Sequence, residues 1–330
     1  MTTRRFDVTA IGNAIVDVIA QADDSLLAEH NLPKGAMNLI DAQTAEKLYS
    51  IMGPGKEASG GSAGNTIAGI AALGGKTAYI GKVAADQLGE VFTHDIRAVG
   101  VTYDTKPLVD GLPTARSLIF VTPDAQRTMQ TFLGATTQLG PEDINMDYIT
   151  SSKVVYLEGY LWDQPRAKKA MRDAAIKAQD SGVKVSLTLS DAFCVARFRD
   201  EFLELAEKHV DILFANETEI LSLYQTDNFD EALQQVRRHC EIAALTRSEK
   251  GSVVINGDEV HIIDAVKGVK VVDTTGAGDA YAAGFLYAYT HGRDLATCGR
   301  LGGAMAAKVI SHFGPRSEVA DVKKIAASVL

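Results

Sequence analysis

The sequence lacks long apolar runs and paired cysteines. None of its hydrophobic stretches approaches the ~18 apolar residues of a membrane-spanning helix. Arg4 and Arg5 precede an apolar run, 8–11, that has only the length of a strand, so we expect no signal peptide. Cys194, Cys240 and Cys298 form no Cys-x-x-Cys pair and indicate reduced thiols. We therefore expect a cytoplasmic protein with no membrane partner.

Clustered positive charge is also missing. The chain has 33 Lys and Arg against 42 Asp and Glu, a formal net charge of −9 at pH 7, with both signs interspersed. Because no basic cluster could follow a phosphate backbone, we expect no nucleic-acid partner. The seven histidines show no His-x-x-x-His spacing, which argues against a zinc site. The remaining composition, 46% hydrophobic and 23% charged over 330 residues, is that of one large globular domain.

Short apolar segments alternate with helical patterns along most of the chain. This alternation predicts parallel β-α-β units, and hence a doubly wound, mostly parallel sheet with helices on both faces. We expect a single α/β domain spanning 1–330. The predicted strands are 6–11, 77–83, 153–157, 183–189, 211–215, 242–246 and 269–272. The predicted helices are 65–73, 87–99, 166–180 and 197–209.

Two stretches change to a period of two residues. They lie at 36–40 and at 101–133, where segments 116–121 and 127–133 flank a predicted turn at 122–126. We interpret them as a small β-lid formed by discontinuous segments at about 14–41 and 101–135 that covers one edge of the main domain. A decorated sheet edge with no moving part fits the pattern equally well. A separate hairpin, 252–263, turns at Asn256-Gly257.

Two glycine-rich segments match known motifs only in part. The Gly-Lys-Thr at 75–77 resembles the end of a P-loop, but Ile70 stands where that motif needs glycine, and a helix precedes it. The Gly-Pro-Gly at 53–55 fits a loose dinucleotide fingerprint but also follows a helical pattern. The sequence therefore excludes a P-loop and leaves a dinucleotide oxidoreductase as a distant alternative.

The segment 273–280, Asp-Thr-Thr-Gly-Ala-Gly-Asp-Ala, carries the strongest chemical signal. It follows a predicted strand and leads into a helix whose first turn holds Asp279. Free N–H groups at a helix start, together with the helix dipole, suit a phosphoryl group. A carboxylate beside them repels bound phosphate, so its useful task is to take a proton from an attacking hydroxyl. In the alternative, Asp279 only caps the helix.

The same segment resembles the C-terminal signature of the ribokinase-like (PfkB) carbohydrate and nucleoside kinases. The Gly-Gly-Ser-Ala-Gly-Asn at 60–65 resembles the family's N-terminal signature, and the Asn-Glu-Thr-Glu at 216–219 resembles its Asn-x-x-Glu motif. Segments 12–17, 126–128 and 210–219 are most similar to the adenosine-kinase branch. The resemblance covers essentially the whole chain. It implies a ribokinase-like fold with a β-lid, and an ATP-dependent kinase that is a monomer or a homodimer and acts on a small nucleoside or sugar.

The resemblance also implies roles for the matched residues. Asp279 would be the base, the amides of 276–278 an anion hole, and Arg127 a clamp on the transferring phosphoryl. Mg²⁺ would lie near Glu219, bridged by water, and a monovalent cation stays open. The predicted catalytic residues are Asp279, Gly276, Ala277, Gly278 and Arg127. The predicted substrate-binding residues are Asn13, Asp17, Gly61, Asn65, Met37 and Leu39. The predicted ATP-binding residues are Asn216, Glu219, Thr246, Ser248, Gly251 and Thr275.

Three departures from the family pattern limit these assignments. Thr188 stands where the family often has asparagine, the lid loop at 113–115 reads Pro-Thr-Ala instead of Pro-Thr-Gly, and 160–162 reads Tyr-Leu-Trp where adenosine kinases place adjacent aromatics. The base-stacking residue is therefore unassigned. We expect transfer of the ATP γ-phosphoryl to the 5′-hydroxyl of adenosine or a similar nucleoside. The alternatives are a kinase for ribose, fructose or a keto-deoxy sugar acid, and a non-catalytic nucleoside-binding protein.

Overall fold

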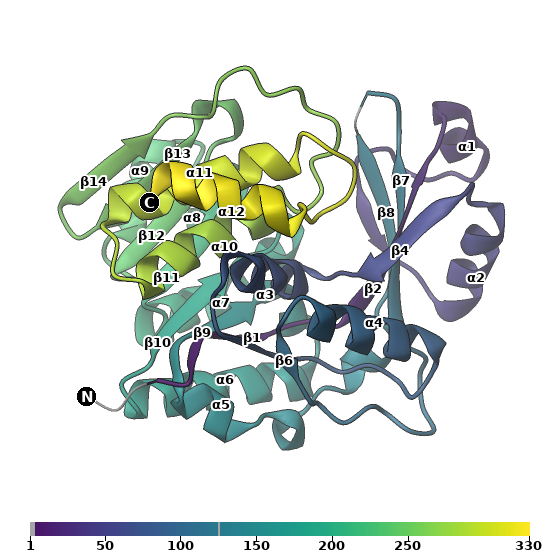
Figure 1. Ribbon diagram of the computed structural model, residues 1–330, viewed down its shortest axis with the longest axis horizontal. Helices are drawn as coiled ribbons and strands as arrows, with labels where there is room; N and C mark the ends of the chain where they lie inside the picture. The colour runs from purple at the N-terminus through teal and green to yellow at the C-terminus, as the bar shows by residue number, and fades with distance from the viewer. Residues whose placement is uncertain (1–3, 125) are drawn as a thin grey trace.

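The computed structural model describes residues 4–124 and 126–330. Within them the chain forms a nine-stranded sheet in the order β14-β13-β12-β11-β10-β9-β1-β5-β6 (Figure 1). Neighbouring strands are parallel from β12 to β6, and the last two pairs, β12–β13 and β13–β14, are antiparallel. The strands are β1 Phe6–Ile11, β5 Thr77–Ile80, β6 Thr102–Tyr103, β9 Ser152–Glu158, β10 Lys184–Thr188, β11 Ile212–Asn216, β12 Ile242–Thr246, β13 Ser252–Asn256 and β14 Glu259–Ile263.

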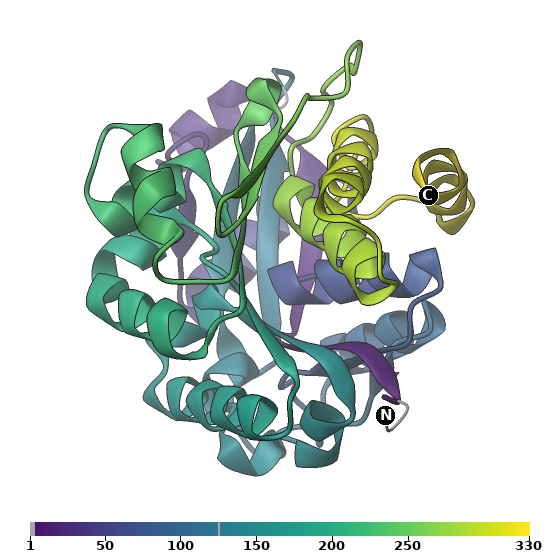
Figure 2. The ribbon, with the colours of Figure 1, turned by 90° about the vertical axis from the view of Figure 1, so that its left-hand side faces the viewer.

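Helices cover both faces of this sheet, as Figure 2 shows for the green and yellow layers on either side of it. Alternate residues of one strand enter different cores. Val155 and Leu157 of β9 pack with the first helical layer, whereas Val154 and Tyr156 pack with the second. The first layer contains α5 Met146–Thr150, α6 Pro165–Asp180, α7 Ala192–His209, α8 Glu217–Tyr224 and α9 Phe229–Val236. The second contains α3 Ser62–Leu73, α4 Gln87–Ala98, α10 Ala277–Thr290, α11 Leu295–Val309 and α12 Val319–Val329. The predicted doubly wound fold is confirmed.

A second sheet of five strands lies beside the main domain, in the order β3-β8-β7-β2-β4 (Figure 1). Its strands are β2 Ile15–Gln21, β3 Met37–Leu39, β4 Gly55–Ser59, β7 Ala115–Val121 and β8 Arg127–Phe132. Two helices, α1 Asp24–Glu29 and α2 Ala42–Ile51, pack on one face through Leu27 and Leu48. We call this sheet with its two helices the lid. β4 lies outside the two segments that the sequence pattern indicated, and the predicted turn at 122–126 includes Ala125, which lies outside the described residues.

One predicted strand is wrong. Segment 269–272 is irregular, and Val271 is 47% exposed. The reason is that the β13–β14 hairpin completes the edge of the sheet, so the chain crosses from there to the helical layer without a strand partner. The N–H of Val272 donates instead to the carbonyl of Ile310, at 2.8 Å. The motif at 273–280 therefore connects a loop to α10.

Two absences hold for the described residues. The three cysteines are buried and form no disulfide there, which agrees with the sequence prediction. No helix in this part of the chain is long and apolar enough to cross a membrane.

Candidate active site

The carboxyl ends of the parallel strands bring most of the predicted residues to one edge of the sheet. Gly12 and Asn13 follow β1, and the strand-end pairs Glu158–Thr188 and Asn216–Thr246 lie in register on neighbouring strands. In open α/β sheets this edge is where ligands bind. The N-termini of α3 and α10 meet at the same edge. The structure therefore collects residues that are more than 200 positions apart in the sequence.

Asp279 lies in the first turn of α10 and contacts the first turn of α3. Its Oδ1 accepts a hydrogen bond from the Ser62 hydroxyl, at 2.7 Å, and its Oδ2 accepts one from Asn65 Nδ2, at 3.1 Å. Burial raises the pKa of Asp279, while these two donors and the charge of Arg127 act in the opposite direction. The carboxylate is thus a half-buried proton acceptor held by two donors, which is an arrangement that suits a general base.

Several backbone N–H groups in the turn around Asp279 have no hydrogen-bond acceptor among the described residues. Gly276 has φ +77°, and a Cβ there would lie 2.8 Å from the carbonyl oxygen of Pro315. Gly278 is exposed, and a Cβ there would meet nothing within 4 Å. The N–H of Ala277 donates to Thr274, at 3.3 Å, whereas no group among the described residues accepts from the N–H of Gly276, Gly278 or Asp279. The free donors at this turn are therefore the N–H groups of these three residues.

Asp273 holds this turn in place. Its Oδ1 accepts hydrogen bonds from the N–H and the hydroxyl of Thr275, at 2.9 and 2.6 Å. Its Oδ2 accepts one from the N–H of Gly314, at 2.9 Å, in the loop after α11. Thr275, predicted to contact ATP, therefore uses its hydroxyl within the turn. The conformation of the turn that carries the predicted anion hole therefore depends on the buried carboxylate of Asp273. Asp273 is part of the sequence motif, but the sequence did not reveal this role.

Several of the predicted substrate-binding residues lie near Asp279. Asp17, on β2, is 5% exposed, and burial raises its pKa to about 7, against the opposing charge of Arg316. It packs on Gly60, where a Cβ would lie 2.1 Å from the Asp17 carboxyl carbon. Gly61 has φ +79°, and a Cβ there would lie 2.2 Å from the backbone oxygen of Asn13. The two glycines are required because the backbone of this segment touches the chain around Asn13 and Asp17.

Glu158 connects three parts of the site and was not predicted from the sequence. Its Oε1 accepts from Asn13 Nδ2 at 2.7 Å and from the Asn13 N–H at 3.3 Å, and its Oε2 accepts from the Ala63 N–H at 2.8 Å. Burial raises the pKa of Glu158 to about 7. The residue fixes Asn13 relative to the start of α3. An acidic residue at the carboxyl end of the apolar run 154–157 was the available signal.

Asn216 and Glu219 contact each other. The Asn216 side chain accepts from the Glu219 N–H at 2.8 Å, and the Glu219 carboxylate accepts from Asn216 Nδ2 at 2.6 Å and from the Asn216 N–H at 3.0 Å. This reciprocal pair is a capping box at the start of α8, which an Asn-x-x-Glu spacing permits. Burial raises the pKa of Glu219 to about 7. The motif thus has a structural task besides any contact with ATP.

The remaining predicted residues lie on the lid and on the turn after β12. Arg127 begins β8, on the lid, and its charge lowers the pKa of both Asp17 and Asp279. Met37 and Leu39 lie on the edge strand β3, where Leu39 is 48% exposed. Thr246, Ser248 and Gly251 lie in or beside the turn between β12 and β13. Trp162 is fully buried and donates to Glu201 at 3.2 Å, so it is a core residue and does not stack on a ligand in this site.

The described residues contain no preformed cluster of metal ligands. Among the described residues, no group of three or more His, Cys, Asp or Glu side chains could hold a metal ion. This fits Mg²⁺, which keeps much of its water shell and binds through one or two carboxylates together with substrate phosphates. Glu219, in the first turn of α8, is the carboxylate that the sequence analysis predicts to contact this water shell.

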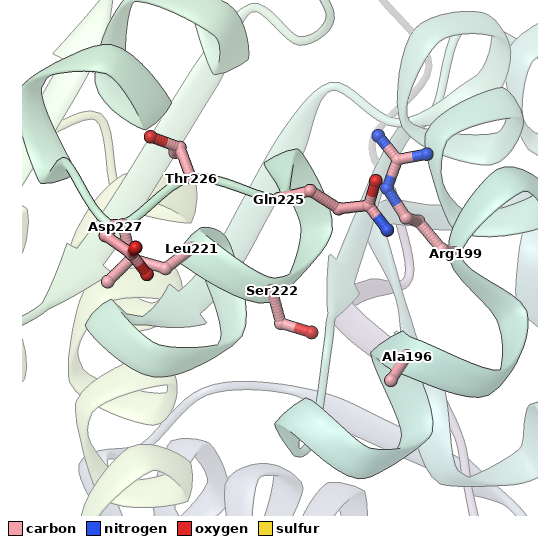
Figure 3. Close-up of a pocket in the computed structure, with 7 residues that line it drawn as sticks. All are labelled: Ala196, Arg199, Leu221, Ser222, Gln225, Thr226 and Asp227. Atoms are coloured by element: carbon pink, nitrogen blue, oxygen red, sulfur yellow. The ribbon is translucent and has the colours of Figure 1, made fainter.

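A surface pocket lies elsewhere, between α7 and α8 (Figure 3). Its volume is about 340 Å³, and its lining includes Arg199, Ser222, Gln225 and Asp227. The Arg199 Nε already donates to the carbonyl of Leu223, at 2.7 Å. None of the predicted site residues lines this pocket, so it is separate from the candidate active site.

Comparison with known proteins decides the family. The sequence matches the family described as "pfkB family carbohydrate kinase" over residues 35–321, most of the chain. The chain belongs to the PfkB kinase family. An adenosine kinase from Sinorhizobium meliloti is 57% identical, with a TM-score of 0.95, over 99% of this chain and 100% of that one. A probable sugar kinase from Rhizobium etli CFN 42 is 56% identical, with a TM-score of 0.94, over the same shares.

A more distant curated relative agrees with this assignment. An uncharacterized sugar kinase from Archaeoglobus fulgidus is 31% identical over 248 residues, which are 75% of this chain and 96% of the relative. This PfkB protein is therefore a kinase for a sugar or a nucleoside, and membership in the family implies ATP as the phosphoryl donor. The family assignment favours a kinase over the two alternatives outside the kinases, a binding protein without activity and a dinucleotide oxidoreductase.

Proposed function

We propose that this kinase transfers the γ-phosphoryl of ATP to the 5′-hydroxyl of adenosine or a similar nucleoside, with Asp279 as the general base. The contact geometry of Asp279 carries the proposal. The carboxylate is half-buried, both its oxygens face hydrogen-bond donors, and open N–H groups lie in the same turn. A proton acceptor adjacent to an anion-binding turn is what in-line attack by a hydroxyl on phosphorus requires.

The chain's own residues divide the work. Asp17 would accept hydrogen bonds from the vicinal hydroxyls of the acceptor sugar, and Asn13 would donate to them while Glu158 holds its amide. The N–H groups of Gly276, Gly278 and Asp279 would stabilise negative charge on the transferring phosphoryl, with Arg127 approaching from the lid. Asp279 would receive the hydroxyl proton. Bound Mg²⁺ would supply further positive charge to the phosphates, near Glu219.

The similarity to an adenosine kinase at 57% identity supports a nucleoside as acceptor. The similarity to a probable sugar kinase at 56% identity supports ribose, fructose or a keto-deoxy sugar acid as the second candidate. A phosphorylation panel of nucleosides and these sugars, with ATP and Mg²⁺, separates the two. We expect adenosine to have the highest kcat/KM, and turnover of a sugar without turnover of adenosine would reject the nucleoside proposal.

Binding of the acceptor should depend on pH through Asp17. Only the ionised carboxylate accepts hydrogen bonds from two hydroxyls, and its pKa is raised to about 7. We expect the KM for the nucleoside to rise by up to about tenfold for each pH unit below that value. Steady-state kinetics across this range measure this KM.

The matched variant is Asp17→Asn, which keeps the shape of the side chain but cannot ionise. We expect its nucleoside KM to be high at every pH and to depend less on pH near 7 than the wild-type KM does. A wild-type nucleoside KM that stays constant as the pH falls from about 8 to about 6 would show that Asp17 does not bind the acceptor in its ionised form.

A further inference from the structure

Arg316 lies in the loop after α11 and reaches the site from a part of the chain that no sequence motif marks. Its Nε donates to Asn65 Oδ1 at 3.0 Å, and its Nη1 donates to the Ser59 hydroxyl at 2.7 Å. Its Nη2 is buried, faces Gly64, and has no acceptor among the described residues. A buried donor without an acceptor destabilises a fold, so packing alone does not explain an arginine here.

We propose that Arg316 is a positioning residue for phosphoryl transfer, which fixes the amide of Asn65 so that Asn65 Nδ2 donates to the base Asp279. The inference rests on the proposed role of Asp279. It adds a residue that neither the sequence motifs nor the family resemblance contains.

The chemistry of the three groups determines the orientation of the amide. A guanidinium group can only donate hydrogen bonds, and an ionised carboxylate can only accept them. Asn65 lies between the two, at 3.0 Å from Arg316 and 3.1 Å from Asp279. Only one orientation satisfies both neighbours, with Oδ1 toward Arg316 and Nδ2 toward Asp279. Without Arg316 the amide could rotate and place its oxygen against the carboxylate.

The positive charge of Arg316 also acts on the carboxylates around it. It lowers the pKa of Asp17 and of Asp279, in each case against the larger, opposite effect of burial. The groups whose charge affects Arg316 are Asp17 on β2, Tyr79 on β5, Asp95 on α4 and Asp279 on α10. The other titratable groups whose charge interacts with that of Asp279 are Arg127 on β8, Tyr156 and Glu158 on β9, and Glu219 on α8.

The loop that carries Arg316 also links the lid to the anion-binding turn. Ser59, its second acceptor, ends β4 of the lid. Phe313 packs with Ile19 and Ile119 on the face of the lid sheet opposite α1 and α2, and Pro315 lies against Gly276. One short segment therefore contacts the lid, the anion-binding turn and the residue that orients the base.

The test compares Arg316→Met with Arg316→Lys in the full chain, with the best substrate of the panel. We expect Arg316→Met to lower kcat on the order of 10- to 100-fold, the usual effect of a small displacement of reacting groups. The acid limb of its kcat profile should move to higher pH, because the base loses a neighbouring positive charge. Lysine keeps the charge but donates from one nitrogen, so Arg316→Lys should lower kcat and leave the acid limb in place.

A double-mutant cycle with Asn65→Leu tests the route of the effect. If Arg316 acts through Asn65, adding Arg316→Met to Asn65→Leu should lower kcat by less than about twofold. Arg300→Met, on the exposed side of α11, is the matched control and should behave as wild type. Wild-type kcat in Arg316→Met, or independent effects in the cycle, would overturn the inference. A wild-type protein inactive on the whole panel would instead reject the proposed function.

Discussion

Asp279→Asn should lower kcat on the order of 10²–10⁴, because the substitution removes the only group placed to take the hydroxyl proton in the proposed mechanism. The KM values should change much less, since asparagine has nearly the same shape and can still accept a hydrogen bond from Ser62. The measurement is kcat for adenosine across pH. The matched control is Asp294→Asn at the start of α11, where asparagine keeps the cap that Asp294 provides to Thr297.

The same variant should gain stability relative to wild type as pH rises. Burial raises the pKa of Asp279 in the folded state above its value in the unfolded chain. Between those two values the folded protein binds more protons, so the stability that depends on protonated Asp279 is lost as pH increases. Asparagine cannot lose a proton, so the difference in unfolding temperature should grow in favour of the variant. An active variant, or a difference that falls with pH, would contradict the assignment of Asp279.

The main sheet was predictable because its strands are buried on both faces. A strand such as β9, covered by helices on each side, is a short apolar run, and helices of ordinary length separate such runs. The segment 269–272 has the same apolar composition but forms no strand. An apolar composition shows which residues prefer burial, but a strand also needs a neighbouring strand with free N–H and C=O groups. At this side of the main sheet the edge position is occupied by β14, so segment 269–272 has no strand to pair with.

The parts of the candidate site that could be predicted from the sequence are those where the backbone conformation requires a particular residue type. Gly61 and Gly276 adopt positive φ and touch other backbone, so their positions are marked by glycine in the sequence. Arg316 and Glu158 act through side chains that reach across the fold. Arg316 and Asn65 are 251 positions apart, and nothing in the residues around Arg316 indicates that contact. Such partners follow from the topology, which only the structure supplies.

Gly278→Ala and Gly276→Ala should change the stability of the fold in opposite directions, although both replace a glycine in the same turn. Gly278 lies in the first turn of α10, its φ is not positive, and a Cβ there meets no atom within 4 Å. Alanine should therefore stabilise the fold by ~0.4–1 kcal/mol, through the lower conformational entropy of the unfolded chain. Its methyl group would nevertheless occupy the space in front of the free N–H groups. We expect kcat to fall on the order of 10²–10³, as when one donor to a developing anion is lost.

Gly276→Ala should instead destabilise the protein by more than about 1–2 kcal/mol, because alanine at φ +77° is strained and its Cβ would collide with Pro315. Thermal unfolding and kcat of the two variants, measured side by side, separate the two effects. A stable, inactive Gly278→Ala places the migrating phosphoryl group in front of the α10 N-terminus, since the methyl group disturbs nothing else there. If this variant keeps wild-type kcat, the phosphoryl group is bound elsewhere, and Asp279 is too far from the reacting hydroxyl to serve as its base.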